Sequence, residues 1–229
     1  MGYLDADGEQ HAPLASCADV GFERCPPVRA FPSYRGQRNW PGLWWFATTG
    51  SHVGFESWLE RDHVMRLDFD REVVGLASQP FWLFWAVDGE SRRHAPDFFV
   101  RRRDGSAVVV DCRPDHRIRP RDVQAFEATA AACEVLGWEF ERVGSLDPVL
   151  AGNLRWLAGY RQPRFADPAV GGRLREVFGG PRRLMDGVSL VGLPMAVLPV
   201  LFHLLWRGEL SADLSIVLSG RSVVWGGSR

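Results

Sequence analysis

The sequence predicts a mixed α/β fold followed by a smaller helical region. A helical pattern at 55–70 precedes several short β-prone runs. A second helical pattern at 122–136 leads into one more strand at 138–143, so the order is helix, mixed sheet, helix, strand. The 229 residues, 46% of them hydrophobic, suffice for one large domain, or for a medium-sized domain and a small one.

The chain divides into three parts by composition. Residues 1–30 are rich in Asp, Gly, Pro and Ala without periodicity, so we expect a flexible N-terminal tail. Residues 31–145 form the predicted α/β domain, and residues 146–229 form the C-terminal region. The α/β domain begins with a segment that contains Trp40, Trp44 and Trp45. These tryptophans could stack on bases, but we expect them to pack in a core.

The first helical pattern, FESWLERDHVMRLDFD at 55–70, is amphipathic. Glu56, Glu60 and His63 follow one another at helical spacing and are predicted to form one polar stripe. Either glutamate could reach into a metal site, with His63 as a further candidate. The alternative is a solvated helix face without a chemical role.

A hairpin at residues 98–110 is the centre of the predicted domain. Strands at 72–77 and 81–87 precede it, and the Asp104-Gly105 pair is a strong tight-turn signal. Asp97 stands at the start of the first hairpin strand and Asp111 at the end of the second, so the two carboxylates are expected to lie side by side. The alternative is that these aspartates merely end two strands.

Residues that follow Asp111 extend the pattern. Because alternate strand residues share a face, Arg113 is expected to point the same way as Asp111, while Cys112 points away. Two carboxylates and a cation that converge at one end of a hairpin would hold a divalent metal ion against a phosphate.

The formal net charge of -1 gives no overall signal for a polyanionic partner, but arginines cluster locally. Residues 90–121 carry nine Arg and five acidic residues, and residues 161–183 carry six Arg and two acidic residues. Such clusters either contact phosphates or form solvated surface. The candidates for DNA contact are Arg101, Arg102, Arg103, Arg117 and Arg119.

All 27 basic residues are arginine, which indicates a bias toward GC-rich codons. The four cysteines lack the spacing of a zinc site and the density of a disulfide scaffold. They are typical of free thiols in a reducing compartment. The N-terminus lacks the pattern of a signal peptide, so a cytoplasmic location is expected.

The C-terminal region combines a helical pattern at 147–161, a linker at 163–172 and a long apolar run at 188–206. The run is long enough to resemble a membrane span. It is interrupted by Gly192, Pro194, Pro199 and His203. A turn, a short amphipathic segment and a β-prone run at 223–225 follow, which is the order of a small winged-helix module. We therefore expect no membrane partner.

Four motifs taken together resemble the TnsA-like endonuclease subunit of heteromeric transposases: FESWLERD, the Gln-Pro pair after the first strand, APDFFV and VVVDCR. The resemblance covers roughly residues 55–143 and implies a restriction-endonuclease-like core of the PD-(D/E)xK type. By that resemblance the catalytic residues are Glu60, Asp97, Asp111 and Arg113, with Glu56 as a neighbouring candidate. The implied cofactor is Mg²⁺, or Mn²⁺ in its place, held by Asp97, Asp111, Glu60 and the Cys112 carbonyl.

The resemblance also implies a function. Members of the family cut double-stranded DNA at the 5′ ends of a transposon, beside a DDE-type transposase, and contact an ATPase regulator through the C-terminal region. Arg113 stands where the family has lysine, and a guanidinium cannot lose its proton although it can bind a phosphate through two hydrogen bonds. The alternatives are therefore an inactive DNA-binding or assembly subunit, and a standalone restriction or repair nuclease.

Overall fold

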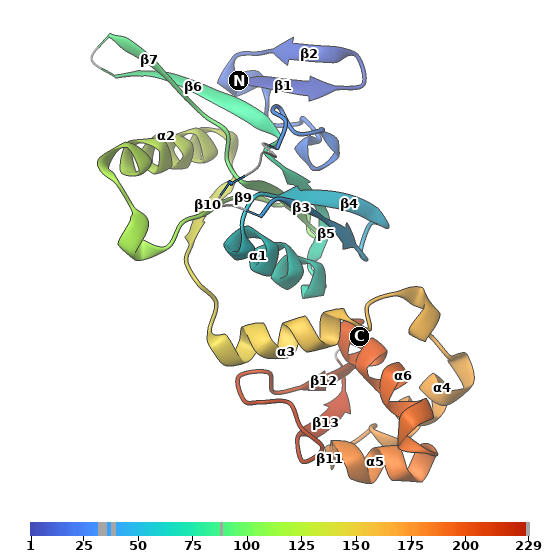
Figure 1. Ribbon diagram of the computed structural model, residues 1–229. Coiled ribbons are helices and arrows are strands. Elements are labelled where there is room, and N and C mark those ends of the chain that lie inside the picture. The colour runs from blue at the N-terminus through green and yellow to red at the C-terminus, as the bar shows by residue number, and fades with distance from the viewer. Residues whose placement is uncertain (32–35, 38–39, 88, 228–229) are drawn as a thin grey trace. The chain divides into compact units, whose positions relative to one another are not determined.

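The computed structural model describes residues 1–31, 36–37, 40–87 and 89–227 (Figure 1). The chain is of the mixed α/β class and forms two compact units. One comprises residues 1–64 and 72–145, here called the α/β unit. The other comprises residues 65–71 and 146–229, here called the C-terminal unit. Across the described residues, no helix combines the length and apolar character needed to cross a membrane.

The central sheet of the α/β unit has the strand order β10-β9-β8-β5. Its strands are β5 (Val73–Ser78), β8 (Phe98–Arg102), β9 (Ala107–Cys112) and β10 (Glu139–Val143). β5, β8 and β9 pair antiparallel, whereas β10 runs parallel to β9. Parallel neighbours need a crossover, and helix α2 (Pro120–Leu136) supplies it. Gly137, at φ 68°, ends α2 in the left-handed conformation that favours glycine.

The predicted hairpin is confirmed. Phe98 pairs with Val110 and the chain turns at Gly105, whose φ is 88°. The Asp104 carboxylate accepts the Ser106 N–H at 2.9 Å and fixes the turn. Every residue of β9 is buried, as expected for a strand that is covered on both faces.

The expected flexible tail at 1–30 is wrong, because these residues build part of the core. Strands β1 (Gly2–Asp5) and β2 (Gly8–His11) form a hairpin. It joins β6 (Phe81–Val87) and β7 (Glu90–His94) in a second sheet, in the order β2-β1-β6-β7 (Figure 1). Two short 3₁₀ turns follow the hairpin, Leu14–Ser16 and Phe22–Arg24. Phe22 is fully buried, with its ring centroid 4.9 Å from that of Phe81 and 5.6 Å from that of Phe99.

Helix α1 spans Trp58–Phe69 and so begins three residues later than the sequence pattern predicts. Phe55 instead ends strand β4 (Ser51–Phe55), which pairs with β3 (Gly42–Phe46). Glu56 therefore precedes the helix and is not part of a polar stripe on it. Trp44 and Trp45, in β3, are partly buried, as expected, but Trp40 is 64% exposed.

The C-terminal unit contains four helices of its own and a small sheet. The helices are α3 (Pro148–Ala158), α4 (Pro168–Val177), α5 (Leu184–Val191) and α6 (Pro194–Trp206). The strands are β11 (Arg182–Arg183), β12 (Leu210–Ala212) and β13 (Val223–Gly226), in the order β11-β13-β12. The predicted linker is partly helical, because Asp167 caps α4 at Pro168. Gly192 and Leu193 divide the long apolar run into α5 and α6, and the buried face of α6 forms much of the core.

Candidate active site

Asp97 and Asp111 are held together at the end of the β8–β9 hairpin. The Asp97 carboxylate accepts the N–H of Cys112 at 2.7 Å, and the Asp111 carboxylate accepts the N–H of Asp97 at 3.3 Å. The Asp97 carbonyl accepts a third bond, from the N–H of Gln79 at 3.0 Å. These three hydrogen bonds extend the pairing of β8 with its neighbours by one residue beyond Phe98. They fix the position of the Asp97 carboxylate.

The electrostatic surroundings of Asp97 are unfavourable to its charge. Burial is the main cause that raises its pKa well above the usual value, and the negative charges of Glu60 and Asp111 raise it further. The Cys112 N–H and the Arg113 guanidinium act in the opposite direction. A partly buried carboxyl beside two others is a position that a bound cation would stabilise.

Glu60 has a structural role that the sequence reading missed. Its carboxylate accepts the Ser57 hydroxyl and the Glu56 N–H, each at 2.7 Å, while the Glu60 N–H donates to the Ser57 hydroxyl at 3.2 Å. This arrangement is a variant of the capping box, in which a glutamate three residues after serine satisfies free N–H groups at a helix start. Burial raises the pKa of Glu60. The Ser57-x-x-Glu60 spacing is the signal that could have located the start of α1.

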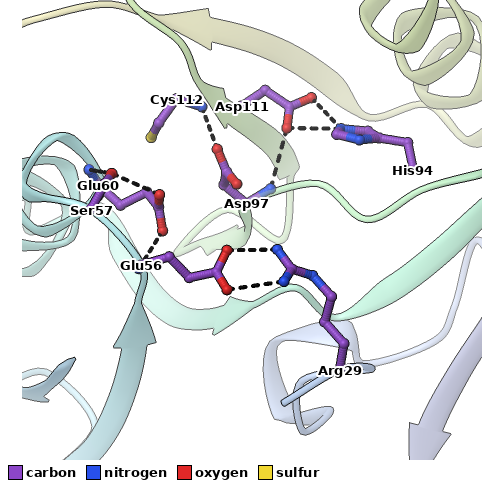
Figure 2. Close-up of polar contacts among 8 residues, drawn as sticks. All are labelled: Arg29, Glu56, Ser57, Glu60, His94, Asp97, Asp111 and Cys112. Carbon is purple, nitrogen blue, oxygen red and sulfur yellow. Dashed lines mark hydrogen bonds and ion pairs between the residues drawn. The ribbon is translucent and has the colours of Figure 1, made fainter. Parts of the chain in front are cut away.

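Glu56 forms an ion pair with Arg29 of the N-terminal segment. The Arg29 guanidinium donates to both Glu56 oxygens, at 3.0 and 2.6 Å. Such a two-point pair compensates the charge of the carboxylate and holds it in place. Among the described residues, the bonds to the Glu60 oxygens come from Ser57 and the Glu56 N–H, and no arginine is bonded to them. In Figure 2, Glu60 lies to the left of Asp97 and the Glu56–Arg29 pair lies below it.

Asp111 faces a histidine that sequence reasoning did not single out. His94, at the end of β7, lies with its Nε2 3.0 Å from each Asp111 oxygen. Figure 2 shows this pair on the other side of Asp97 from Glu60. The two residues are 17 positions apart, and His94 lies at the end of β7, where its backbone pairs with Leu83 of β6. The sequence carries no local signal for this contact.

A cavity of about 630 Å³ opens beside these residues. Its lining includes Glu60, Asp97 and Arg113, which the sequence predicted to converge, and also His94. Asp111 does not belong to the lining formed by the described residues, and is 2% exposed. Of the four residues predicted to converge, Glu60, Asp97 and Arg113 line the cavity. Asp111 is buried behind Asp97 and accepts its N–H.

The donor set is too small for a metal ion held by three side chains, but it can hold a hydrated divalent cation. Within the part of the chain that the structure describes, no three His, Cys, Asp or Glu side chains are arranged to hold a metal ion. Asp97 and Glu60 nevertheless offer carboxylate oxygens to one cavity, and the raised pKa of Asp97 reflects charge that a cation would offset. Magnesium commonly takes only one or two protein carboxylates and keeps several waters, so this set suits it.

The remaining candidates lie in different places. His63 is 2% exposed, and its Nε2 lies 2.7 Å from the Gly144 carbonyl oxygen, so it belongs to the core. Arg117 lines the cavity, and Arg119 precedes α2. The arginines at and just beyond the turn end of β8, Arg101 to Arg103, lie about 13–20 Å along the strand direction from Asp97, at the usual rise per residue. Arg101 pairs with Glu23 at 3.3 Å, and Arg102 pairs with Glu139 at 2.9 Å.

The site residues that sequence reasoning missed are Arg29, His94, Trp58, Trp82 and Arg93, all of which line the same cavity. Comparison with known proteins adds no assignment: no protein-family model and no curated protein matches the chain.

Proposed function

We propose that the α/β unit is a metal-dependent DNA endonuclease with a restriction-endonuclease-like core. The observation that carries this proposal is the placement of Asp97. It is a partly buried carboxylate in one cavity with Glu60 and Arg113, at the end of a hairpin whose second strand continues into Arg113. Acidic residues with a cation in one cavity are the groups that phosphodiester hydrolysis needs.

The order of elements supports the same core. A helix, three antiparallel strands, a crossover helix and a strand parallel to the last of the three follow one another as α1, β5, β8, β9, α2 and β10. This is the order expected from the motifs in the sequence. The β1–β2 and β6–β7 hairpins are additions to it, and the β6–β7 hairpin brings Trp82, Arg93 and His94 to the cavity.

Each residue of the site has a proposed task. Asp97 and Glu60 would hold Mg²⁺ or Mn²⁺, together with the Cys112 carbonyl. When bound, such an ion lowers the pKa of a coordinated water and offsets charge on the phosphate. Arg113 binds a phosphate oxygen, and Asp111 fixes the position of Asp97 by accepting its N–H. The capping bonds at Ser57 hold Glu60 in one orientation.

We further propose that the enzyme is the 5′-end-cutting subunit of a heteromeric transposase, working beside a DDE-type transposase. The C-terminal unit supports this assignment by its element order. Helix, strand, two helices and two strands follow as α4, β11, α5, α6, β12 and β13, as in winged-helix modules. In the proposed complex this unit contacts an ATPase regulator.

Arg113 favours one alternative, a subunit that binds DNA without cutting it. A titrating amine at this position would contribute to proton transfer, which a guanidinium cannot do. The retention of Asp97 and Glu60 in one cavity favours the active enzyme.

Cleavage of a transposon-end duplex tests the proposal directly. Asp97→Asn should abolish Mg²⁺-dependent cutting, because the amide cannot supply an anionic ligand. Asp7→Asn, in the exposed β1–β2 turn, is the matched control and should cut like the natural protein. Equal cutting by the Asp97→Asn and natural proteins, with the fold shown intact by circular dichroism, would exclude the assigned site.

A further inference from the structure

Three tryptophans surround the candidate site. Trp40 precedes β3, Trp58 begins α1 and Trp82 lies in β6, and all three line the cavity that contains Asp97. Trp40 is 64% exposed and Trp58 is 52% exposed. A core tryptophan would be buried, so the indoles of Trp40 and Trp58 are not core side chains, whereas Trp82 is partly buried. Their exposure at one cavity indicates a ligand with flat apolar faces.

Two of the tryptophans carry an arginine on one ring face. The Arg61 guanidinium carbon lies 4.1 Å from the ring centroid of Trp58, and that of Arg93 lies 4.5 Å from the centroid of Trp82. A guanidinium stacked in this way holds the indole in place and covers one face only. Arg61 also pairs with Asp62, at 2.7 Å. These contacts restrict the Trp58 side chain before a ligand binds, so Trp58 loses less conformational entropy on binding.

The same cavity is rich in cations. Arg29, Arg93, Arg113 and Arg117 line it, and Arg29 is bonded to Glu56. Arginines that can meet phosphates, together with exposed aromatic rings, are the two components of sites that bind single-stranded nucleic acid. A volume of about 630 Å³ lies in the middle of the range of small-molecule pockets, roughly 300–1,000 Å³, so whole nucleobases can enter.

We propose that this cavity takes DNA with unpaired bases beside the phosphate that is cut, and that the unpaired bases stack on Trp40 and Trp58. This inference rests on the proposed nuclease function and specifies its substrate class. Bases within a continuous duplex are stacked on their neighbours, so neither face of such a base is free to stack on an indole. A flap, a bulge or a frayed strand end has a free base face, so the enzyme distinguishes these from continuous duplex.

The strength of the preference follows from stacking. Loss of one base–aromatic stack in comparable sites lowers affinity by about 5- to 150-fold. Removing either Trp40 or Trp58 should therefore weaken binding of DNA with unpaired bases by a factor in that range. Binding of fully paired duplex depends on the arginines and should not change.

The test measures binding by the full chain in EDTA, so that no cutting occurs. The probes are two duplexes of one sequence, one fully paired and one with a two-base bulge that contains 2-aminopurine. We expect the natural protein to quench the 2-aminopurine fluorescence and to bind the bulged duplex at least about tenfold more tightly. Trp40→Ala and Trp58→Ala should reduce the quenching and the preference, whereas Trp58→Phe should retain much of both.

Trp156→Ala is the control, because Trp156 is 56% exposed but belongs to the C-terminal unit. It should behave like the natural protein. Equal affinity for the two duplexes, or a preference that survives in Trp40→Ala and Trp58→Ala, would overturn the inference and point to a protein partner for these side chains. A separate assay adds Mg²⁺. Cutting without preference for the bulge defeats the inference alone, whereas tryptophan-dependent binding without any cutting defeats the nuclease proposal.

Discussion

His94 Nε2 lies 3.0 Å from both oxygens of Asp111, at a point where the carboxylate is almost completely buried. The same carboxylate accepts the N–H of Asp97. Asp111 therefore links a cavity-lining histidine to the backbone of the main candidate ligand. The pair ties the β7 strand of the second sheet to the β9 strand of the central sheet, and it fixes the orientation of the imidazole.

His94→Ala should destabilise the protein, because it leaves a buried carboxylate with one hydrogen bond fewer. A loss of about 1–3 kcal/mol is expected for a buried group that loses its partner. The measurement is urea unfolding followed by tryptophan fluorescence. His116→Ala, an exposed histidine of the loop after β9, is the control and should stay within about 0.5 kcal/mol of the natural protein.

A double-variant cycle separates this contact from general damage. Asp111→Asn removes the charge, so His94→Ala made in that background should cost less than in the natural protein. Additive losses for the two substitutions would show that the pair does not interact in solution.

Glu60 allows its two roles to be separated by chemistry. Glu60→Gln keeps an oxygen that can accept the Ser57 hydroxyl or the Glu56 N–H, as glutamine does in capping boxes. Unfolding stability should therefore stay close to that of the natural protein, while Mg²⁺-dependent cutting falls sharply with the lost charge. Glu60→Ala should lose activity and also about 0.5–2 kcal/mol of stability.

Both properties are read from one preparation, by urea unfolding and by single-turnover cleavage. Glu56→Gln is a further comparison, because its partner is Arg29 and not the cap. Full cutting activity in Glu60→Gln would remove this carboxylate from the proposed chemistry.

The cysteines should be unreactive while the protein is folded. All four are free and buried. Burial raises the pKa of Cys25 to about 11 and that of Cys133 to about 12, so both stay protonated near neutral pH and lack the reactive thiolate. Labelling with a thiol reagent at pH 8 should be slow in buffer and should reach four groups per chain in denaturant. Rapid labelling of Cys133 in buffer would contradict its burial under the folded sheet.

The elements that local sequence determines are the ones that it predicts well. The β8–β9 hairpin needs only the Asp104-Gly105 turn and two apolar runs, and its register then places Asp97 opposite Asp111. The N-terminal segment could not be predicted in this way. Phe22 and Cys17 are isolated apolar residues in a polar context, and only their contacts with distant strands bury them.

The site shows the same division between local and distant information. Asp97 and Arg113 follow from the hairpin, but the partners of the carboxylates come from elsewhere. Arg29 reaches Glu56 across 27 residues, and His94 reaches Asp111 across 17. The sequence pattern predicts the start of α1 three residues too early, because Phe55 fits both a strand end and a helix face. The capping bonds of Ser57 start the helix after Phe55.

The role of Arg113 distinguishes an active from an inactive enzyme, and its surroundings allow it to be substituted without disturbing the fold. Its side chain is 45% exposed, and its Nε lies 3.9 Å from an Asp122 oxygen. An ion pair at this long distance, with a half-exposed arginine, contributes only about 0–1 kcal/mol, so substitutions of Arg113 should leave the fold intact. Arg121 is the matched control, because it also approaches Asp122, at 3.7 Å, but does not line the cavity as described.

If the task of Arg113 is electrostatic, Arg113→Lys should keep the cutting rate, since either cation can offset charge on a phosphate. Arg113→Ala should then lose a stabilisation commonly worth a few kcal/mol, and so about a hundredfold or more in rate. Arg121→Ala should cut at the natural rate. The measurement is single-turnover cutting of a transposon-end duplex with Mg²⁺ and the partner transposase present. A large rise in rate for Arg113→Lys would show that the site needs a titrating amine. Equal rates for the natural protein, Arg113→Lys and Arg113→Ala would show that this side chain takes no part in the reaction, which favours the DNA-binding subunit.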